Sequence, residues 1–80
     1  MTNHTIILTD LPLNTPAIIN NIKGGPGFQR RLFVMGIRKG TTIKIICKQP
    51  LRGPITIQAC GCQMTLGRGM AHKIEVDVIQ

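Results

Sequence analysis

The chain has 80 residues, with ten Lys and Arg against three Asp and Glu, which gives a net charge of +7. This length allows one domain, residues 1–80, with a small core. The apolar runs are far shorter than the roughly 20 residues of a membrane helix, and no signal-peptide pattern precedes them. We therefore expect a soluble, cytoplasmic protein without membrane insertion, and the excess positive charge predicts an acidic partner.

The predicted elements begin after a polar start, residues 1–5, which we expect to fray. A turn is predicted at 9–12 and a loop at 50–54. Cys60-Gly61 has the pattern of a two-residue hairpin turn. A tight connector is expected at 67–72. The predicted helix covers about 27–35, and the predicted strands cover 17–22, about 41–49, 55–59, 62–66 and about 73–79.

The predicted helix has one apolar face, because Phe28, Leu32 and Met35 are spaced at i, i+4 and i+7. Gly36 follows at the position where a helix end favours a residue tolerant of positive φ. A helix this short is not stable alone and must pack on the strands that follow it.

Each predicted strand alternates apolar and polar residues, as in a half-buried antiparallel sheet. Five short strands joined by tight turns close most easily into a small barrel, so the fold class is mainly β with one short helix packed against it. The expected core consists of Phe28, Leu32, Ile43, Ile45, Ile55, Ile57, Met64, Leu66, Ile74 and Val76.

The sequence offers little for catalysis. It contains no serine, and its only acidic residues are Asp10, Glu75 and Asp77. Glu75 and Asp77 share a strand face that we expect to be solvated and paired with Lys73. A phosphate-binding G-x-x-x-x-G-K-[ST] loop is absent from the sequence. We expect no enzymatic activity.

The cysteines and histidines do not predict a metal site. By strand parity Cys47 and Cys62 point inward as small buried hydrophobes, whereas Cys60 lies at a hairpin tip and points outward. A four-ligand site built from these residues with His4 and His72 would not converge. Three cysteines, an odd number, also do not indicate a disulfide framework. We expect no metal and no cofactor.

The basic residues remain as candidates for function. Seven of the ten lie within positions 30–52, and we predict that they form a partner-binding patch: Arg30, Arg31, Arg38, Lys39, Lys44, Lys48 and Arg52. Lys44 and Lys48 are expected to share an outward strand face. Nucleic acid is the usual partner of such a patch, but the chain has only two aromatic residues for base stacking.

The order of these motifs resembles the FeoA family, the ferrous iron transport proteins A. The resemblance starts at residues 8–12, continues through 50–55 and ends at 74–76. The sequence departs from the family pattern in three ways: Lys39 replaces a usual proline, Asn14 stands near a usual glycine, and Gly67 and Gly69 flank Arg68 where the family more often has charged or small helical residues. The central matching positions are Arg30, Arg31, Leu32, Met35, Gly36, Gly40, Ile43 and Ile45, with Gly61 and Leu66 further on.

The resemblance implies an SH3-like barrel and an accessory or regulatory role in ferrous iron uptake. The implied partner is FeoB, a membrane permease with a cytoplasmic GTPase domain, and the role is protein–protein contact without catalysis. Two alternatives stay open: a nucleic-acid-associated or repressor-like module, since DtxR-type repressors carry a similar domain, and a small metal or redox carrier. Specific nucleic-acid binding is not expected, and the oligomeric state, including a homo-oligomer, stays open.

Overall fold

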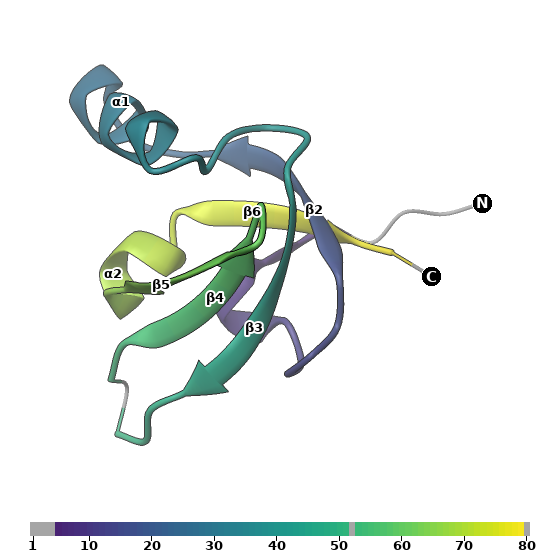
Figure 1. The fold of residues 1–80 in the computed structure, drawn as a ribbon. Coiled ribbons are helices and arrows are strands. Elements are labelled where there is room, and N and C mark those ends of the chain that lie inside the picture. Colours follow the sequence, from purple (N-terminus) through teal and green to yellow (C-terminus); the bar gives the residue numbers. More distant parts are fainter. Residues whose placement is uncertain (1–4, 52, 80) are drawn as a thin grey trace.

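The computed structural model describes residues 5–51 and 53–79. One antiparallel sheet of six strands forms its body, in the order β1-β6-β2-β3-β4-β5 (Figure 1). No helix in these two ranges is long and apolar enough to cross a membrane. The strands are β1 (Thr5–Ile7), β2 (Ala17–Ile22), β3 (Thr42–Lys48), β4 (Ile55–Ala59), β5 (Cys62–Leu66) and β6 (Ile74–Val78), with a 3₁₀ turn η1 (Leu8–Asp10) and the helices α1 (Pro26–Val34) and α2 (Arg68–Ala71).

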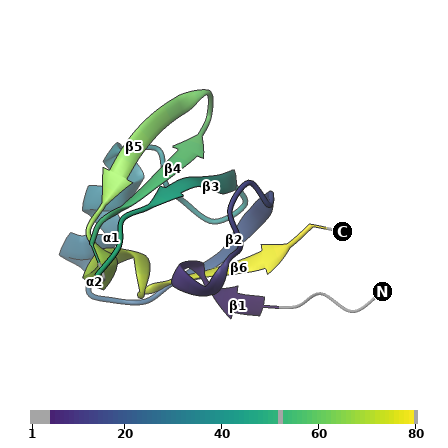
Figure 2. The same ribbon diagram turned by 90° about the horizontal axis from the view of Figure 1, so that it is seen from below.

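The sheet is strongly curved, so that β3, β4 and β5 lie across from β2, β6 and β1 (Figure 2). Two irregularities help it to bend, one in β2 between Ile19 and Asn21 and one in β3 between Ile45 and Cys47. The mainly β, SH3-like prediction is confirmed. The barrel is not closed, because the end strands β1 and β5 do not pair with each other within the described residues.

Helix α1 begins with Pro26, whose missing N–H costs nothing at a first helical position, and it stops at a glycine as predicted. Gly36 has φ of +90°. Its N–H donates to the Phe33 carbonyl at 3.0 Å, and the Ile37 N–H donates to the Leu32 carbonyl at 2.8 Å. These two bonds form a Schellman motif, and its usual hydrophobic contact joins Leu32 and Ile37, both fully buried.

The core consists of buried aliphatic residues from five strands, β2 to β6, from both helices and from the connecting turns, and it confirms most of the predicted set. Phe28 and Met64 are only partly buried; Met64 lies on the edge strand β5, which has a neighbour on one side only. The predicted core omitted other members: some are buried through turns and helix ends, and others lie on β2 and β4, where buried and less buried residues alternate as in the other strands. These additional buried residues are Leu8, Leu11, Ala17, Ile19, Ile22, Ile37, Ala59 and Ala71.

Two further predictions were wrong. The five predicted strands omit β1, which starts at Thr5 and pairs with β6, so Thr5 is not part of a frayed end; residues 1–4 lie outside the described residues. The connector at 67–72 contains a helical turn, α2. Its formation in spite of two glycines follows from packing, because Ala71 is fully buried and its N–H bonds to the Gly67 carbonyl.

The end of α1 can be tested by alanine substitution of two glycines, because the two substitutions should change the free energy of unfolding in opposite directions. A Cβ added at Gly36 or at Gly27 meets no atom within 4 Å, so the two positions differ in backbone conformation alone. Gly36→Ala should lower the free energy of unfolding by about 1–2 kcal/mol, because alanine is disfavoured at positive φ. Gly27→Ala should raise it by about 0.5–1 kcal/mol, because alanine is the better helix former.

Urea unfolding of both variants and of the unsubstituted chain measures these changes. Equal stability of the two variants would mean that the positive φ at Gly36 does not determine the end of the helix.

Candidate functional site

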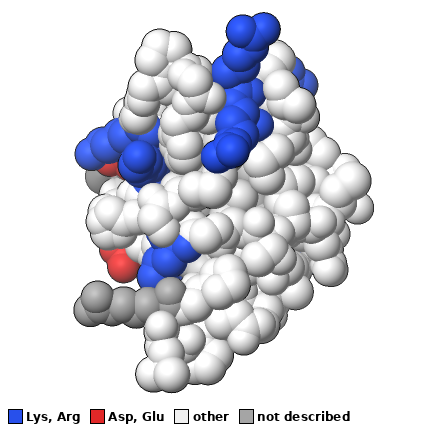
Figure 3. Space-filling view, turned by 90° about the vertical axis from the view of Figure 1, so that its left-hand side faces the viewer, with Lys and Arg blue, Asp and Glu red and all other residues white. Residues whose placement is uncertain are grey.

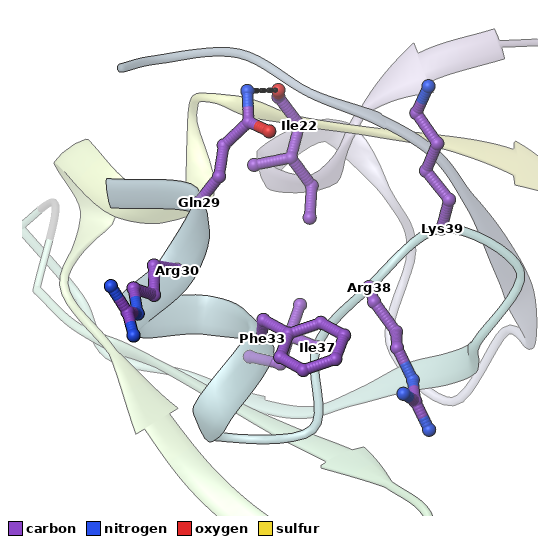
Figure 4. Close-up of a pocket in the computed structure, with 7 residues that line it drawn as sticks. All are labelled: Ile22, Gln29, Arg30, Phe33, Ile37, Arg38 and Lys39. Atoms are coloured by element: carbon purple, nitrogen blue, oxygen red, sulfur yellow. Dashed lines mark hydrogen bonds between the residues drawn. The ribbon is translucent and has the colours of Figure 1, made fainter. Parts of the chain in front are cut away.

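A pocket of about 320 Å³ lies between α1 and the turn that leads into β3 (Figure 4). Ile22 at the end of β2, Phe33 on α1 and Ile37 after α1 surround its centre. Its lining comes from three consecutive parts of the chain: Ile22, then Gln29, Arg30 and Phe33, then Ile37, Arg38 and Lys39.

Backbone and side-chain hydrogen bonds fix both walls of this pocket. On one wall the Gln29 amide Nε2 donates to the carbonyls of Ile22 and Gly24, each at 3.1 Å, which ties the first turns of α1 to the end of β2. On the other wall the Gly40 N–H donates to the Ile19 carbonyl at 2.9 Å, so the turn that carries Lys39 is held on β2. The pocket is therefore part of the folded framework.

The pocket combines an apolar centre with a cationic rim. Ile37 is fully buried and Ile22 nearly so, whereas Phe33 keeps 56% of its surface exposed. The Arg38 guanidinium carbon lies 5.2 Å from the centroid of the Phe33 ring, a cation–π arrangement. Figure 4 shows the charged ends of Arg30, Arg38 and Lys39 directed away from the centre, and none of the lining residues is acidic.

Basic side chains dominate the end of the molecule where α1 lies, while much of the rest of that face is uncharged (Figure 3). Arg31 is exposed on α1 but does not line the pocket. Lys44 lines a different pocket of about 190 Å³ with Cys60 and Gly61. Arg52 lies outside the described residues. The structure thus brings three of the seven predicted patch residues together; a role in partner binding stays a prediction for all seven.

The prediction that Lys44 and Lys48 share an outward face was wrong. The irregularity in β3 places an extra residue, Ile46, opposite β4, and the parity changes after it. Lys48 is consequently opposite the buried Ile55, and its Nζ donates to the Thr9 carbonyl at 3.0 Å. Lys48 therefore covers the end of the core near η1, on a different sheet face from Lys44.

The burial predicted for Cys47 and Cys62 was also wrong, since all three thiols are exposed, although Cys62 does lie on the inward parity that was predicted for it. Cys47 is turned outward by the same irregularity and lies opposite Thr56. Cys62 lies opposite the buried Ala59, but it is on the edge strand β5 next to the hairpin, where no further strand covers it. Within residues 5–51 and 53–79, no three His, Cys, Asp or Glu residues are grouped so that they could hold a metal ion.

The acidic residues of β6 serve strand pairing. Glu75 pairs with Lys23 at 3.5 Å and not with Lys73, whose Nζ lies 4.8 Å from the centroid of the Phe28 ring, so that predicted pair was wrong. The Asn20 amide and the Thr5 hydroxyl donate to the Asp77 carboxylate and hold its pKa below the ordinary value. This shift follows from contacts among β1, β2 and β6 and does not indicate acid–base catalysis.

Sequence reasoning missed the apolar part of the pocket. Phe33 lies away from the apolar helix face, between basic residues, and an exposed aromatic in that position was an available signal. Ile37 could not be assigned, because its burial depends on the backbone closure at Gly36. A third hollow, of about 470 Å³, is lined by Thr9, Asp10, Arg68 and His72, and the Arg68 Nε is buried without a hydrogen-bond partner in the described structure.

Comparison with known proteins gives consistent matches. The model of the FeoA domain family matches residues 6–78. A putative Fe(2+) transport protein A from Methanocaldococcus jannaschii is 40% identical over 60 residues, which cover 75% of this chain and 71% of that protein. A Fe(2+) transport protein A/Fe(2+) transporter FeoB fusion protein from Porphyromonas gingivalis is 33% identical over 72 residues. That match covers 90% of this chain and 8% of the fusion protein.

Solved structures share the fold. The crystal structure of an iron uptake regulatory protein, FeoA, superposes with a TM-score of 0.87 at 29% identity and covers 95% of this chain and all of that one. A manganese-dependent transcriptional repressor also reaches a TM-score of 0.87, but at 18% identity and over 44% of its own chain. The likeness to the repressor is one of fold alone.

The three cysteines provide a direct test of the corrected exposure of Cys47 and Cys62. Without denaturant, a dithiobis(nitrobenzoate) reagent should modify all three thiols of the native chain, because Cys47, Cys60 and Cys62 are exposed. The absorbance of the released thiolate counts the modified thiols, and the same count in denaturant is the control. A native count of one would support the original parity, in which only Cys60 faces solvent.

Proposed function

The chain belongs to the FeoA domain family, as its sequence resemblance predicts, and on this premise we propose that it is an accessory protein of ferrous iron uptake. It acts in the cytoplasm by docking on a FeoB-type transporter. The transporter carries out the movement of iron, and this chain catalyses no reaction.

The observation that carries this proposal is the fused relative. In the Porphyromonas gingivalis protein, a segment similar to 90% of this chain belongs to one polypeptide with a Fe(2+) transporter FeoB. Fusion keeps two modules at an effective concentration on the order of millimolar, which favours contacts that separate chains must make by diffusion. A separate chain of the same family requires a surface for that contact.

The pocket beside α1 is the surface that suits such a contact best. Arg30, Arg38 and Lys39 form its rim without an acidic neighbour in the lining, so an acidic protein surface would complement it. With a net charge of +7, the whole chain favours approach to such a surface, and the attraction is screened by salt over about 8 Å at physiological ionic strength.

The distribution of acidic groups supports a role without catalysis. Glu75 bonds to Lys23, Asp77 bonds to Asn20 and Thr5, and neither acid lines the pocket. General acid–base catalysis needs a titratable group in the site with a pKa near the working pH. The pocket is lined instead by arginine, lysine, glutamine and hydrocarbon.

Charge reversal at the rim tests the docking role. Lys39→Glu should weaken association with the transporter roughly tenfold and reduce ferrous uptake in cells that depend on this chain, because a rim cation becomes an anion. Lys73→Glu is the matched control: it changes the net charge equally, and the exposed Lys73 belongs neither to the predicted patch nor to the pocket lining. Co-purification and uptake of labelled ferrous iron are the measurements.

Equal effects of the two substitutions would assign the attraction to net charge and remove the pocket rim from the docking surface. A titration with duplex DNA accompanies the experiment. Tight, sequence-selective binding of DNA would favour the repressor-like alternative over docking, because non-specific binding to phosphates is weak and falls steeply with salt.

The absence of a resident metal is a separate prediction. After dialysis against a weak chelator, the purified chain should retain no stoichiometric iron or zinc, and it should not hydrolyse GTP. Elemental analysis and phosphate release measure these properties. One metal ion per chain, lost when Cys60 and Cys62 are replaced by alanine, would instead support a small metal carrier.

A further inference from the structure

We infer that the pocket beside α1 binds a short acidic peptide segment of the partner, with one aliphatic side chain in the centre and carboxylates on the rim. This inference rests on the proposed function for the identity of the partner, and it adds the ligand chemistry and the way in which the segment binds. Three properties of the pocket lead to it: its size, its apolar centre and its unbalanced charge.

The size suits a side chain and its neighbours in an extended segment. Ligand pockets in proteins have volumes of about 300–1,000 Å³, and this one, at about 320 Å³, is at the lower limit. A peptide that inserts one side chain and lies across the opening needs no larger space. The walls are held by the Gln29 and Gly40 hydrogen bonds, so little ordering is required when the segment binds.

The centre of the pocket is complementary to an apolar group. Phe33 is 56% exposed and the adjacent Val34 is 78% exposed, although both belong to the same short helix. Of these two, only Phe33 faces the pocket, together with Ile22 and Ile37 (Figure 4). The Gln29 Nε2 already donates to two carbonyls, and Ile22, Phe33 and Ile37 supply the apolar surface of the centre.

The rim of the pocket is complementary to carboxylates. Arg30 comes from α1, and Arg38 and Lys39 come from the turn after it, so cations line the opening from two sides. The Arg38 guanidinium carbon lies 5.2 Å from the Phe33 ring centroid, and a guanidinium can donate two N–H groups side by side to one carboxylate. An anionic segment would also relieve the repulsion among the three cations.

A peptide fits this pocket better than a nucleic acid strand. Proteins that bind single strands present successive aromatic platforms for the bases. Phe33 is the only aromatic residue that lines this pocket, and the cation of Arg38 covers part of it. The apolar centre beside Phe33 is formed by two isoleucines, which contact an aliphatic side chain well and offer a base no hydrogen bonds.

The first experiment titrates the ¹⁵N-labelled chain with the blocked peptide acetyl-Glu-Asp-Leu-Asp-Glu-amide. The largest shifts of backbone amides should occur at Phe33, Ile37, Arg38 and Lys39, and binding should weaken with salt. Two comparison peptides separate the apolar contribution to binding from the charged one: one has glycine in place of leucine, and one has the four carboxylates replaced by amides. Each should bind at least about fivefold more weakly, since each lacks one part of the complementarity.

The second experiment uses neighbouring positions on α1. Phe33→Ala should weaken binding of the leucine peptide about tenfold, whereas Val34→Ala, which removes an even more exposed side chain outside the pocket, should leave it unchanged. The dispersion of the amide spectrum and the thermal midpoint verify that both variants are folded. If Phe33→Ala fails to fold, Phe33→Leu provides the same comparison with a smaller change in volume.

Several results would overturn the inference: equal binding of the glycine peptide, equal effects of Phe33→Ala and Val34→Ala, shifts centred on Lys44 instead of Phe33, or displacement of the peptide by a single-stranded oligonucleotide at lower concentration.

Association with the transporter separates this inference from the proposed function. If Lys39→Glu impairs association with the transporter and Phe33→Ala does not, the result supports docking and contradicts the binding of an aliphatic side chain beside Phe33. If the peptide occupies the pocket and neither substitution affects association, the pocket stands and the transporter is not its partner.

Discussion

The backbone closure at Gly36 is the constraint on which the rest of the candidate site depends. Positive φ at this glycine allows the Ile37 N–H to reach the Leu32 carbonyl, which ends α1 and returns the chain to the core. With Ile37 buried against Leu32, Arg38 and Lys39 are carried to the rim of the pocket. The bond from the Gly40 N–H to Ile19 then joins the same turn to the sheet. One change of backbone direction thus completes the core and forms the pocket.

The placement of the few acidic residues explains why the α1 end stays strongly basic. Two of the three acids, Glu75 and Asp77, lie on β6, where they bond to side chains of β1, β2 and the loop after β2. The cations around α1 have none of these acids in their pocket. A small core of aliphatic residues supports the fold, so the charge at this end is not needed for packing and is available for a partner.

The fold alone does not distinguish the functions considered for this chain. A FeoA protein and a manganese-dependent repressor superpose on it with the same TM-score. What differs among such domains is the surface that the barrel presents and the chain to which the barrel is joined. Here the sequence-level matches to the FeoA domain and to a FeoB fusion link the chain to the iron transport proteins, and the pocket beside α1 is the contact surface that we propose.

Local rules in the sequence determined the strands from 17 onward, the helix, its glycine end and the Cys60-Gly61 turn, because alternation, helical spacing and positive φ depend on near neighbours. Tertiary structure alone decided the pairing of β1 with β6, the burial of Ile37 and the orientation of Lys48 and Cys47. The physical reason is the same in these cases. Each of these features takes its conformation from contacts with another part of the chain: a strand pair distant in sequence, a chain reversal and an extra residue in β3. Strand parity beyond such an irregularity cannot be counted from the sequence.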